Sequence, residues 1–209
     1  MTNNEEQLPN AAEPDDLGGS VEVEPRLVPR IYVASLSDYN SGYLHGSWLD
    51  AAQTVDGIES GIAAMLASSS TPGAEEWAIH DYEGFGGITL HEYEDLTLLT
   101  QMAEGLTRHG PAFASWVQLV GRDPQELQRF EEAYLGNHPS LAAYAEELLD
   151  SLGVIAELDR WANDHLGEHL APYVQWDFEG LGRDLDYGGD IRTHEREDGT
   201  LDVFEGGSA

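Results

Sequence analysis

Residues 31–36 form a short apolar run, Ile-Tyr-Val-Ala-Ser-Leu, rich in residues that favour strands. Residues 37–42, Ser-Asp-Tyr-Asn-Ser-Gly, are mostly turn formers. Residues 43–49 return to strand-compatible residues, with Leu and Trp among them. The pattern therefore predicts two strands joined by a turn.

The next segment predicts a helix and then a third strand. Asp56 and Glu59 have the spacing of a capping box at a helix start. The apolar residues after them share one helical face: Ile58, Ile62, Met65 and Leu66. Residues 76–82 alternate as a strand does, and glycines follow. We expect a small β-β-α-β domain over residues 30–95.

From residue 96 the spacing of apolar residues becomes helical. The first two stripes are Leu96, Leu99, Ala103 and Leu106, then Phe113, Trp116, Val117 and Val120. They stop at Gly110-Pro111 and at Gly121. Asp123 and Pro124 begin a third helix, with an apolar face of Leu127, Phe130 and Tyr134 and an end at Gly136. A central helical domain over 96–136 is expected.

The rest of the chain, 137–209, predicts a mixed domain. Helices are expected over 139–152 and 154–166, and Asp177 caps a shorter one that ends at Leu185. Residues 191–204 predict a hairpin around a Glu-Asp-Gly turn. The predicted fold class is α+β, with several domains: a β-β-α-β N-terminal domain, a helical middle and an α+β C-terminal domain.

The charge of the chain narrows the choice of partners. The sequence has 209 residues, with 40 acidic residues, nine arginines, no lysine and a net charge of -31. Nucleic acids and anionic membranes are bound through Lys and Arg, so both are disfavoured as partners. A basic protein partner is favoured instead. Adaptation to high salt is an alternative explanation of the composition alone.

Residues 1–29 predict a disordered acidic leader, because they are mainly Asn, Glu, Asp, Pro and Gly. This segment holds seven of the forty acidic residues, so 33 remain on the folded part. The chain has no cysteine and lacks the basic and apolar stretches of a signal peptide. A cytoplasmic location is therefore expected.

One short motif suggests a metal site. His165-Leu-Gly-Glu-His169 matches the His-x-x-Glu-His pattern of one class of zinc peptidases. Both histidines would lie one turn apart on a helix, with Glu168 as general base. However, Gly167 and the nearby Pro172 favour a fraying helix end, and His165 shares a stripe with apolar residues. A metal-dependent hydrolase is the enzymatic alternative.

A second motif imitates a calcium-binding loop. Asp184, Asp186 and Glu195 occupy positions one, three and twelve of an EF-hand pattern, and Gly189 occupies position six. Position five is Gly188, which has no side-chain oxygen, and no helix is expected after the loop. The pattern therefore favours a helix end followed by a strand, and we expect no cofactor and no catalytic residue.

The acidic residues themselves are the best candidates for a partner-binding surface. Many lie opposite the apolar stripes, and few have a basic residue one turn away. Residues one helical turn apart are about 5–6 Å apart, on the order of a few phosphate intervals along duplex DNA. The candidates are Asp81, Glu83, Glu92, Glu94, Asp95, Glu104, Glu126, Glu131, Glu132, Glu146, Glu147, Asp150, Glu157 and Asp159.

Three ordered blocks resemble one known family. Residues 30–42 with the His-Gly-x-Trp-Leu-Asp of 45–50, residues 75–83, and residues 176–185 with Gly-Asp-Ile at 189–191 are similar to the ArdA-type antirestriction proteins. The resemblance implies an elongated protein that mimics duplex DNA, usually as a homodimer. Such a protein occupies the DNA groove of type I restriction-modification enzymes, blocks cleavage and often modification, and is typically carried by mobile elements.

The leading hypothesis is therefore a non-enzymatic competitive inhibitor that places carboxylates in a basic DNA groove. The first alternative is the hydrolase that uses His165, Glu168 and His169. The second is an acidic chaperone or scaffold for another basic DNA-binding protein.

Overall fold

The computed structural model describes residues 27–207, and this part is an α+β fold. It contains nine α-helices, one short 3₁₀ helix and two three-stranded antiparallel sheets. The predicted disorder of residues 1–26 lies outside the described residues. Leu27, which the sequence placed in the leader, packs against the hydrophobic core.

The first sheet has the predicted β-β-α-β order of elements. Its strands are β1 (Arg30–Ser35), β2 (Gly46–Asp50) and β3 (Trp77–Glu83), in the spatial order β2-β1-β3. Helix α2 (Val55–Ala67) joins β2 to β3, and Ile58, Ile62 and Met65 on it are buried. The apolar positions predicted in this helix are thus its core face.

Two local predictions in this region are wrong. The turn expected after β1 is a short helix, α1 (Leu36–Asn40), because the Ser35 side chain accepts a hydrogen bond from Asp38 N and caps it. Helix α2 is capped by Thr54 rather than Asp56, since the Thr54 hydroxyl accepts from Gly57 N at 3.2 Å.

The buried Asp38 carboxylate gives the first testable prediction. It accepts hydrogen bonds from Ser69 Oγ at 2.5 Å and Thr71 Oγ1 at 2.7 Å. These hydroxyls, Ser69 foremost, lower the pKa of Asp38 from 3.8 to about 2. The folded-state pKa is below the unfolded one, so this stabilisation is present above pH 3.8 and is lost as the pH falls toward 2.

Thermal melts of the wild type and Asp38→Asn should therefore converge as the pH is lowered through that window. The exposed Asp56→Asn, which has the same change of charge, serves as the control. Parallel melting curves for the wild type and Asp38→Asn would contradict the assignment.

Four helices follow the first sheet: α3 (Leu96–His109), α4 (Pro111–Val120), α5 (Pro124–Gln128) and α6 (Phe130–Ala133). The predicted cap and proline at the start of α5 are confirmed, because Asp123 Oδ1 accepts from Gln125 N at 2.8 Å. The predicted continuation of this helix through Tyr134 is wrong. The chain leaves the helix at Tyr134 and pairs as a strand with a distant segment.

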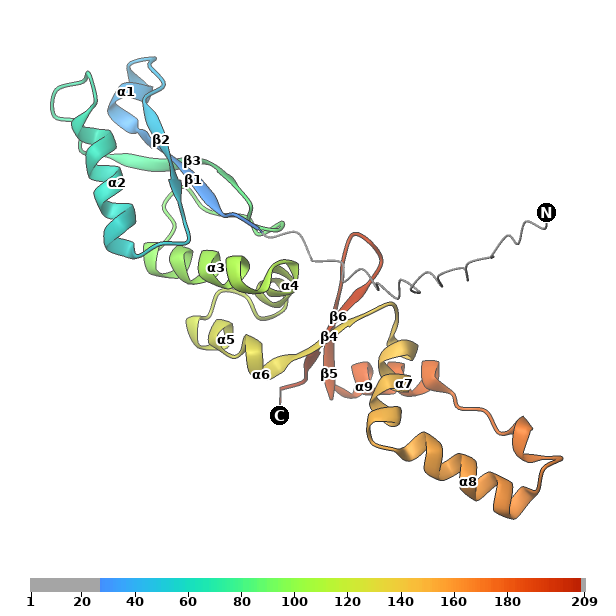
Figure 1. Cartoon of the computed structure of the whole chain (residues 1–209). Coiled ribbons are helices and arrows are strands. Elements are labelled where there is room, and N and C mark those ends of the chain that lie inside the picture. The colour runs from blue at the N-terminus through green and yellow to red at the C-terminus, as the bar shows by residue number, and fades with distance from the viewer. Residues whose placement is uncertain (1–26, 208–209) are drawn as a thin grey trace, which may run out of the picture.

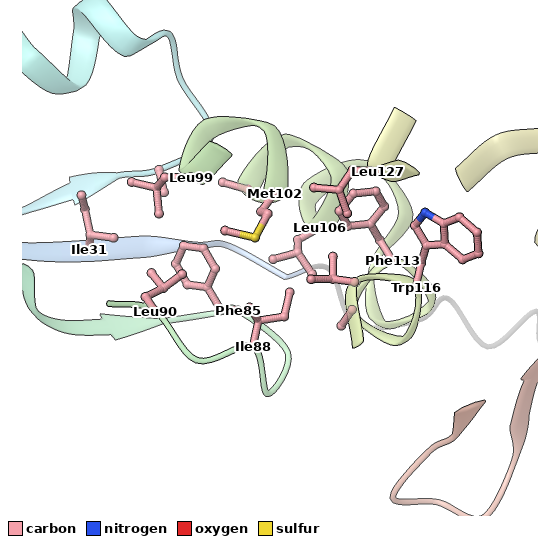
Figure 2. Packing of buried hydrophobic residues seen from close by; sticks show 14 of the residues in the cluster. Ile31, Phe85, Ile88, Leu90, Leu99, Met102, Leu106, Phe113, Trp116 and Leu127 are labelled. Atoms are coloured by element: carbon pink, nitrogen blue, oxygen red, sulfur yellow. The ribbon is translucent and has the colours of Figure 1, made fainter. Parts of the chain in front are cut away.

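One hydrophobic core runs from the first sheet into these helices. Figure 2 shows Leu99, Met102 and Leu106 of α3 in the same cluster as Ile31 and Phe85 on one side and Phe113 on the other. Gly105 is required where α3 meets α4, because a Cβ there would lie 2.3 Å from the Phe113 ring. The core thus continues across the 95/96 boundary, and the division into separate domains stays a prediction.

The C-terminal region combines a second sheet with three helices. Strands β4 (Tyr134–His138), β5 (Ile191–Glu195) and β6 (Leu201–Glu205) form a sheet in the order β4-β6-β5. The hairpin β5–β6 confirms the predicted one. The other elements are α7 (Leu141–Ser151), α8 (Val154–Leu166), the 3₁₀ helix η1 (Ala171–Tyr173) and α9 (Phe178–Gly188).

Helices α7 and α9 pack closely, because Gly182 lets α9 approach the α7 backbone. A Cβ at Gly182 would lie 2.6 Å from the Leu141 carbonyl oxygen. Tyr144, Ile191 and Val203 form a small second core, with Leu141, Leu148 and Leu185 against it.

A buried carboxylate joins the helical middle to the second sheet. Asp202 is fully buried in β6 and accepts two hydrogen bonds from Arg196, each 2.7 Å long. It also accepts from Ser115 Oγ of α4 at 2.6 Å and from Asn137 Nδ2 of β4 at 3.0 Å. The Trp116 and Phe204 rings pack nearby in a tilted arrangement, with centroids 5.0 Å apart. This junction fixes the second sheet against α4.

Figure 1 shows the elements arranged along one long direction. The first sheet and α2 lie at one end, α3 to α6 and the second sheet follow, and α8 lies at the other end. Exposed side chains on successive elements are therefore distributed over the length of the molecule.

Candidate functional site

The fourteen candidate carboxylates lie on elements from both ends of the described chain. Asp81 and Glu83 are on β3; Glu92, Glu94 and Asp95 precede α3; Glu104 is on α3; Glu126 is on α5; Glu131 and Glu132 are on α6; Glu146, Glu147 and Asp150 are on α7; Glu157 and Asp159 are on α8. Twelve of them are exposed, Glu126 is half-buried and Glu94 is buried. Figure 1 shows how far apart β3 and α8 are.

Glu94 has a structural role and does not belong to the surface. Its side chain is 6% exposed and pairs with Arg122 Nη1 at 2.5 Å. It also accepts a hydrogen bond from His91 N at 3.0 Å, and Arg122 donates to the Thr89 carbonyl. This cluster holds the 89–94 segment against the end of α4, and its burial leaves little of the Glu94 side chain exposed to a partner.

Three of the twelve exposed candidates form ion pairs with basic side chains. Glu83 pairs with Arg30 at 3.2 Å, and Glu131 lies 3.8 Å from Arg108 and 3.4 Å from His109. Burial lowers the pKa of His109, against the opposite effect of Glu131, so this imidazole neutralises little charge at neutral pH.

The third exposed candidate that lies beside a basic side chain is Glu147, whose Oε2 lies 3.4 Å from Nδ1 of His138. His138 is buried, and its Nε2 has no hydrogen-bond partner among the described residues. A proton on Nε2 would therefore be buried without an acceptor, so a ring proton is better placed on Nδ1, which faces Glu147.

The other nine exposed candidates have no ion pair within residues 27–207: Asp81, Glu92, Asp95, Glu104, Glu132, Glu146, Asp150, Glu157 and Asp159. Asp95 has a second role, because its Oδ1 accepts from Leu98 N at 2.9 Å and caps α3. The half-buried Glu126 pairs with Arg129 three residues later at 3.1 Å. The surface thus keeps most of its negative charge.

Further exposed carboxylates lie on the same kinds of helix face and were missed. Helix α2 exposes Asp56 and Glu59, and α9 exposes Glu179 and Asp184. The signal that would have found them is the one used elsewhere: an acidic position opposite an apolar stripe. In all, 28 of the 33 acidic residues within 27–207 are exposed.

The helix required by the His-x-x-Glu-His hypothesis ends too early. Helix α8 stops at Leu166, and the positive φ of 70° at Gly167 turns the chain away, so His169 lies outside the helix. Placing both histidines one turn apart on a helix was therefore wrong. His165 instead stacks on Trp161, with centroids 4.8 Å apart, and its Nδ1 lies 2.9 Å from the Trp161 carbonyl oxygen.

The segment that matches the EF-hand pattern also differs in structure from a calcium-binding loop. Asp184 and Asp186 lie within α9, and Asp186 Oδ1 accepts a hydrogen bond from Thr193 Oγ1 at 3.2 Å. Glu195 ends β5, so the segment is a helix end and a strand, as the sequence favoured. No group of three or more potential ligands that could hold a metal ion occurs within residues 27–207.

None of the helices in the described part combines the length and apolar content needed to cross a membrane. A family model described as antirestriction protein (ArdA) matches residues 31–197. Apart from Arg30, this range covers β1 to β5 and the three blocks on which the resemblance was based. No curated protein matches the chain.

Proposed function

The chain belongs to the ArdA family of antirestriction proteins, and from this premise we propose that it is a DNA mimic that occupies the DNA-binding groove of a type I restriction-modification enzyme. In this account the carboxylates take the places of DNA phosphates. The protein inhibits by competition and catalyses no reaction of its own. It blocks restriction and, where the modification subunits use the same groove, modification too.

The observation that supports this mechanism is the set of nine exposed candidate carboxylates that form no ion pair with any residue of 27–207, spread from β3 to α8. On an ordinary helix surface, Lys or Arg one turn away offsets Glu. Here the chain has no lysine, and Glu146 is followed one turn later by Asp150 on α7. Such rows of like charge present an extended negative field, which attracts a cleft lined with Lys and Arg.

We also propose that the protein acts as a homodimer in the cytoplasm and is carried by a mobile element. Membership of the family supports these points, which the sequence resemblance implies. Light scattering of the purified protein would give twice the mass of one chain if the dimer forms, and the mass of one chain if it does not.

The function is tested by adding the purified protein to a type I restriction enzyme and unmethylated plasmid DNA. Cleavage should fall as the protein approaches a molar excess over the enzyme. A plasmid cut by a type II enzyme with a small DNA contact serves as control for general inhibition. Undiminished type I cleavage at large excess, together with capture of a histone-like protein, would instead support the chaperone alternative.

Removing carboxylates should weaken inhibition without unfolding the protein. The double variants Glu104→Gln/Glu132→Gln and Glu157→Gln/Asp159→Asn each remove two exposed charges that have no ion pair in the described part. If each charge replaces one phosphate contact, the slope of log affinity against log salt should fall by about 1 for each charge removed. Fluorescence anisotropy at several salt concentrations measures this slope. An unchanged slope for both variants would show that neither stretch contacts the enzyme.

A further inference from the structure

An open hollow lies beside the first sheet, at the outer edge of β3. It has a volume of about 370 Å³ and is lined by Tyr39, Ile79, His80, Tyr82, Leu90 and Glu92. Tyr39 comes from α1, the next three residues from β3, and the last two from the segment that returns along β3. Two of the sequence blocks that carry the family resemblance thus meet at this hollow.

A β-bulge sets the position of His80. Val33 of β1 pairs with Ile79 and Tyr32 pairs with Asp81, so His80 is the extra residue of the bulge. Bulges change the direction of a side chain relative to a regular strand. The exposed His80 ring lies edge-on to Tyr39, with centroids 4.8 Å apart and an interplanar angle of 83°.

The lining residues divide into a buried apolar part and an exposed polar part. Ile79 and Leu90 are buried, whereas Tyr39 is 57% exposed and Glu92 is exposed. The Glu92 carbonyl accepts a hydrogen bond from Ile79 N at 2.9 Å, which fixes the returning segment beside β3. The Glu92 carboxylate has no ion pair within residues 27–207, so it is free to pair with a ligand.

We propose that this hollow binds the guanidinium group of an arginine on the partner enzyme. Aromatic faces attract cations, and a carboxylate beside them adds a charge-assisted hydrogen bond. A guanidinium fits this lining better than an ammonium, because it is planar, stacks on rings and is more weakly hydrated. The net charge of -31 disfavours anionic ligands.

The inference rests on the proposed function, because an arginine-rich DNA-binding groove supplies the occupant. It adds a different kind of contact to that function. Carboxylates on the helices attract the groove over a distance, whereas the hollow accepts one particular side chain. The hollow therefore contributes to the orientation of the protein in the groove.

The first test uses the protein alone. N-acetyl-arginine amide is titrated into the wild type while the aromatic NMR signals of Tyr39 and His80 are followed, and N-acetyl-citrulline amide is the uncharged control of similar shape. The arginine compound should shift these signals and the citrulline compound should not. Tyr39→Leu should weaken the binding about two- to fivefold, the range of an exposed cation–π contact, while Tyr39→Phe should retain it. Glu92→Gln should weaken it by up to about fivefold, the range of an exposed ion pair.

Equal shifts with both compounds, or binding that is unaffected in Tyr39→Leu and Glu92→Gln, would overturn the inference. Both side chains are exposed, and the NMR spectra of the variants report whether the fold is intact.

The second test separates this inference from the proposed function. In the plasmid-cleavage assay, Tyr39→Leu and Glu92→Gln should raise the concentration needed for half inhibition more than Glu59→Gln, which removes the same charge from α2. If the wild type inhibits and all three variants match it, the hollow has no role and the function stands. If the wild type does not inhibit, the proposed function fails, and the arginine titration decides about the hollow independently.

Discussion

Binding of the protein to a type I restriction enzyme should weaken by about 10³-fold between roughly 50 and 200 mM salt, the lower end of the range for proteins that make 6–10 phosphate contacts. The affinity of DNA-binding proteins falls with salt because binding releases counterions condensed on the phosphates, and this release is less favourable at a higher salt concentration. The carboxylates are spaced more widely than phosphates, so fewer counterions are condensed on them. The slope should therefore be shallower than for DNA with the same enzyme.

Fluorescence anisotropy with labelled protein, repeated with labelled duplex DNA, measures the two slopes side by side. The double variant Glu157→Gln/Asp159→Asn tests the contribution of α8 to the slope, because it removes two charges from this helix at positions with no ion pair in the described chain. A loss of less than tenfold over this salt range would contradict the account, since it would mean that uncharged contacts dominate the binding.

Replacing Asp202 with alanine should lower the free energy of unfolding by about 3–5 kcal/mol, the cost of breaking a buried ion pair by removing one partner. The change removes the carboxylate that accepts two hydrogen bonds from the Arg196 side chain, which is only 12% exposed. It also removes the acceptor for Ser115 of α4 and Asn137 of β4. Because these donors come from α4, from β4 and from the turn between β5 and β6, the loss affects the joint between the helical middle and the second sheet.

Urea denaturation followed by circular dichroism measures this effect. The control is Asp184→Ala, which removes an exposed carboxylate from α9 and should change the stability by no more than about 0.5 kcal/mol. Similar midpoints for both variants would show that the Asp202 cluster does not hold the junction.

Much of the secondary structure could be predicted from the sequence, because residues close together in the sequence determine where these helices begin and end. Helix α8 spans 154–166 as expected, since a glycine lies at each end of a strongly amphipathic segment. Asp177 caps α9, because a carboxylate before a helix satisfies a free backbone N–H group. The exposure of most acidic residues followed from the same helical faces.

The features that were missed depend on partners far away in the sequence. Tyr134 has the spacing to extend a helix, but strand pairing with Phe204 of β6 determines its conformation. Glu94 is buried because Arg122, at the other end of two helices, pairs with it. The hollow beside β3 likewise requires α1, a bulge and the 89–93 segment to meet, and none of these contacts is visible in a local pattern.

The most direct test of the central claim is a competition between the protein and DNA for one groove. Inhibition of a type I restriction enzyme is measured against protein concentration at several concentrations of duplex DNA that carries the recognition site. If carboxylates replace phosphates in the groove, the concentration of protein needed for half inhibition should rise in proportion to the DNA concentration once DNA saturates the enzyme. Half inhibition at the same protein concentration throughout would contradict the account, because enzyme, protein and DNA would then bind together.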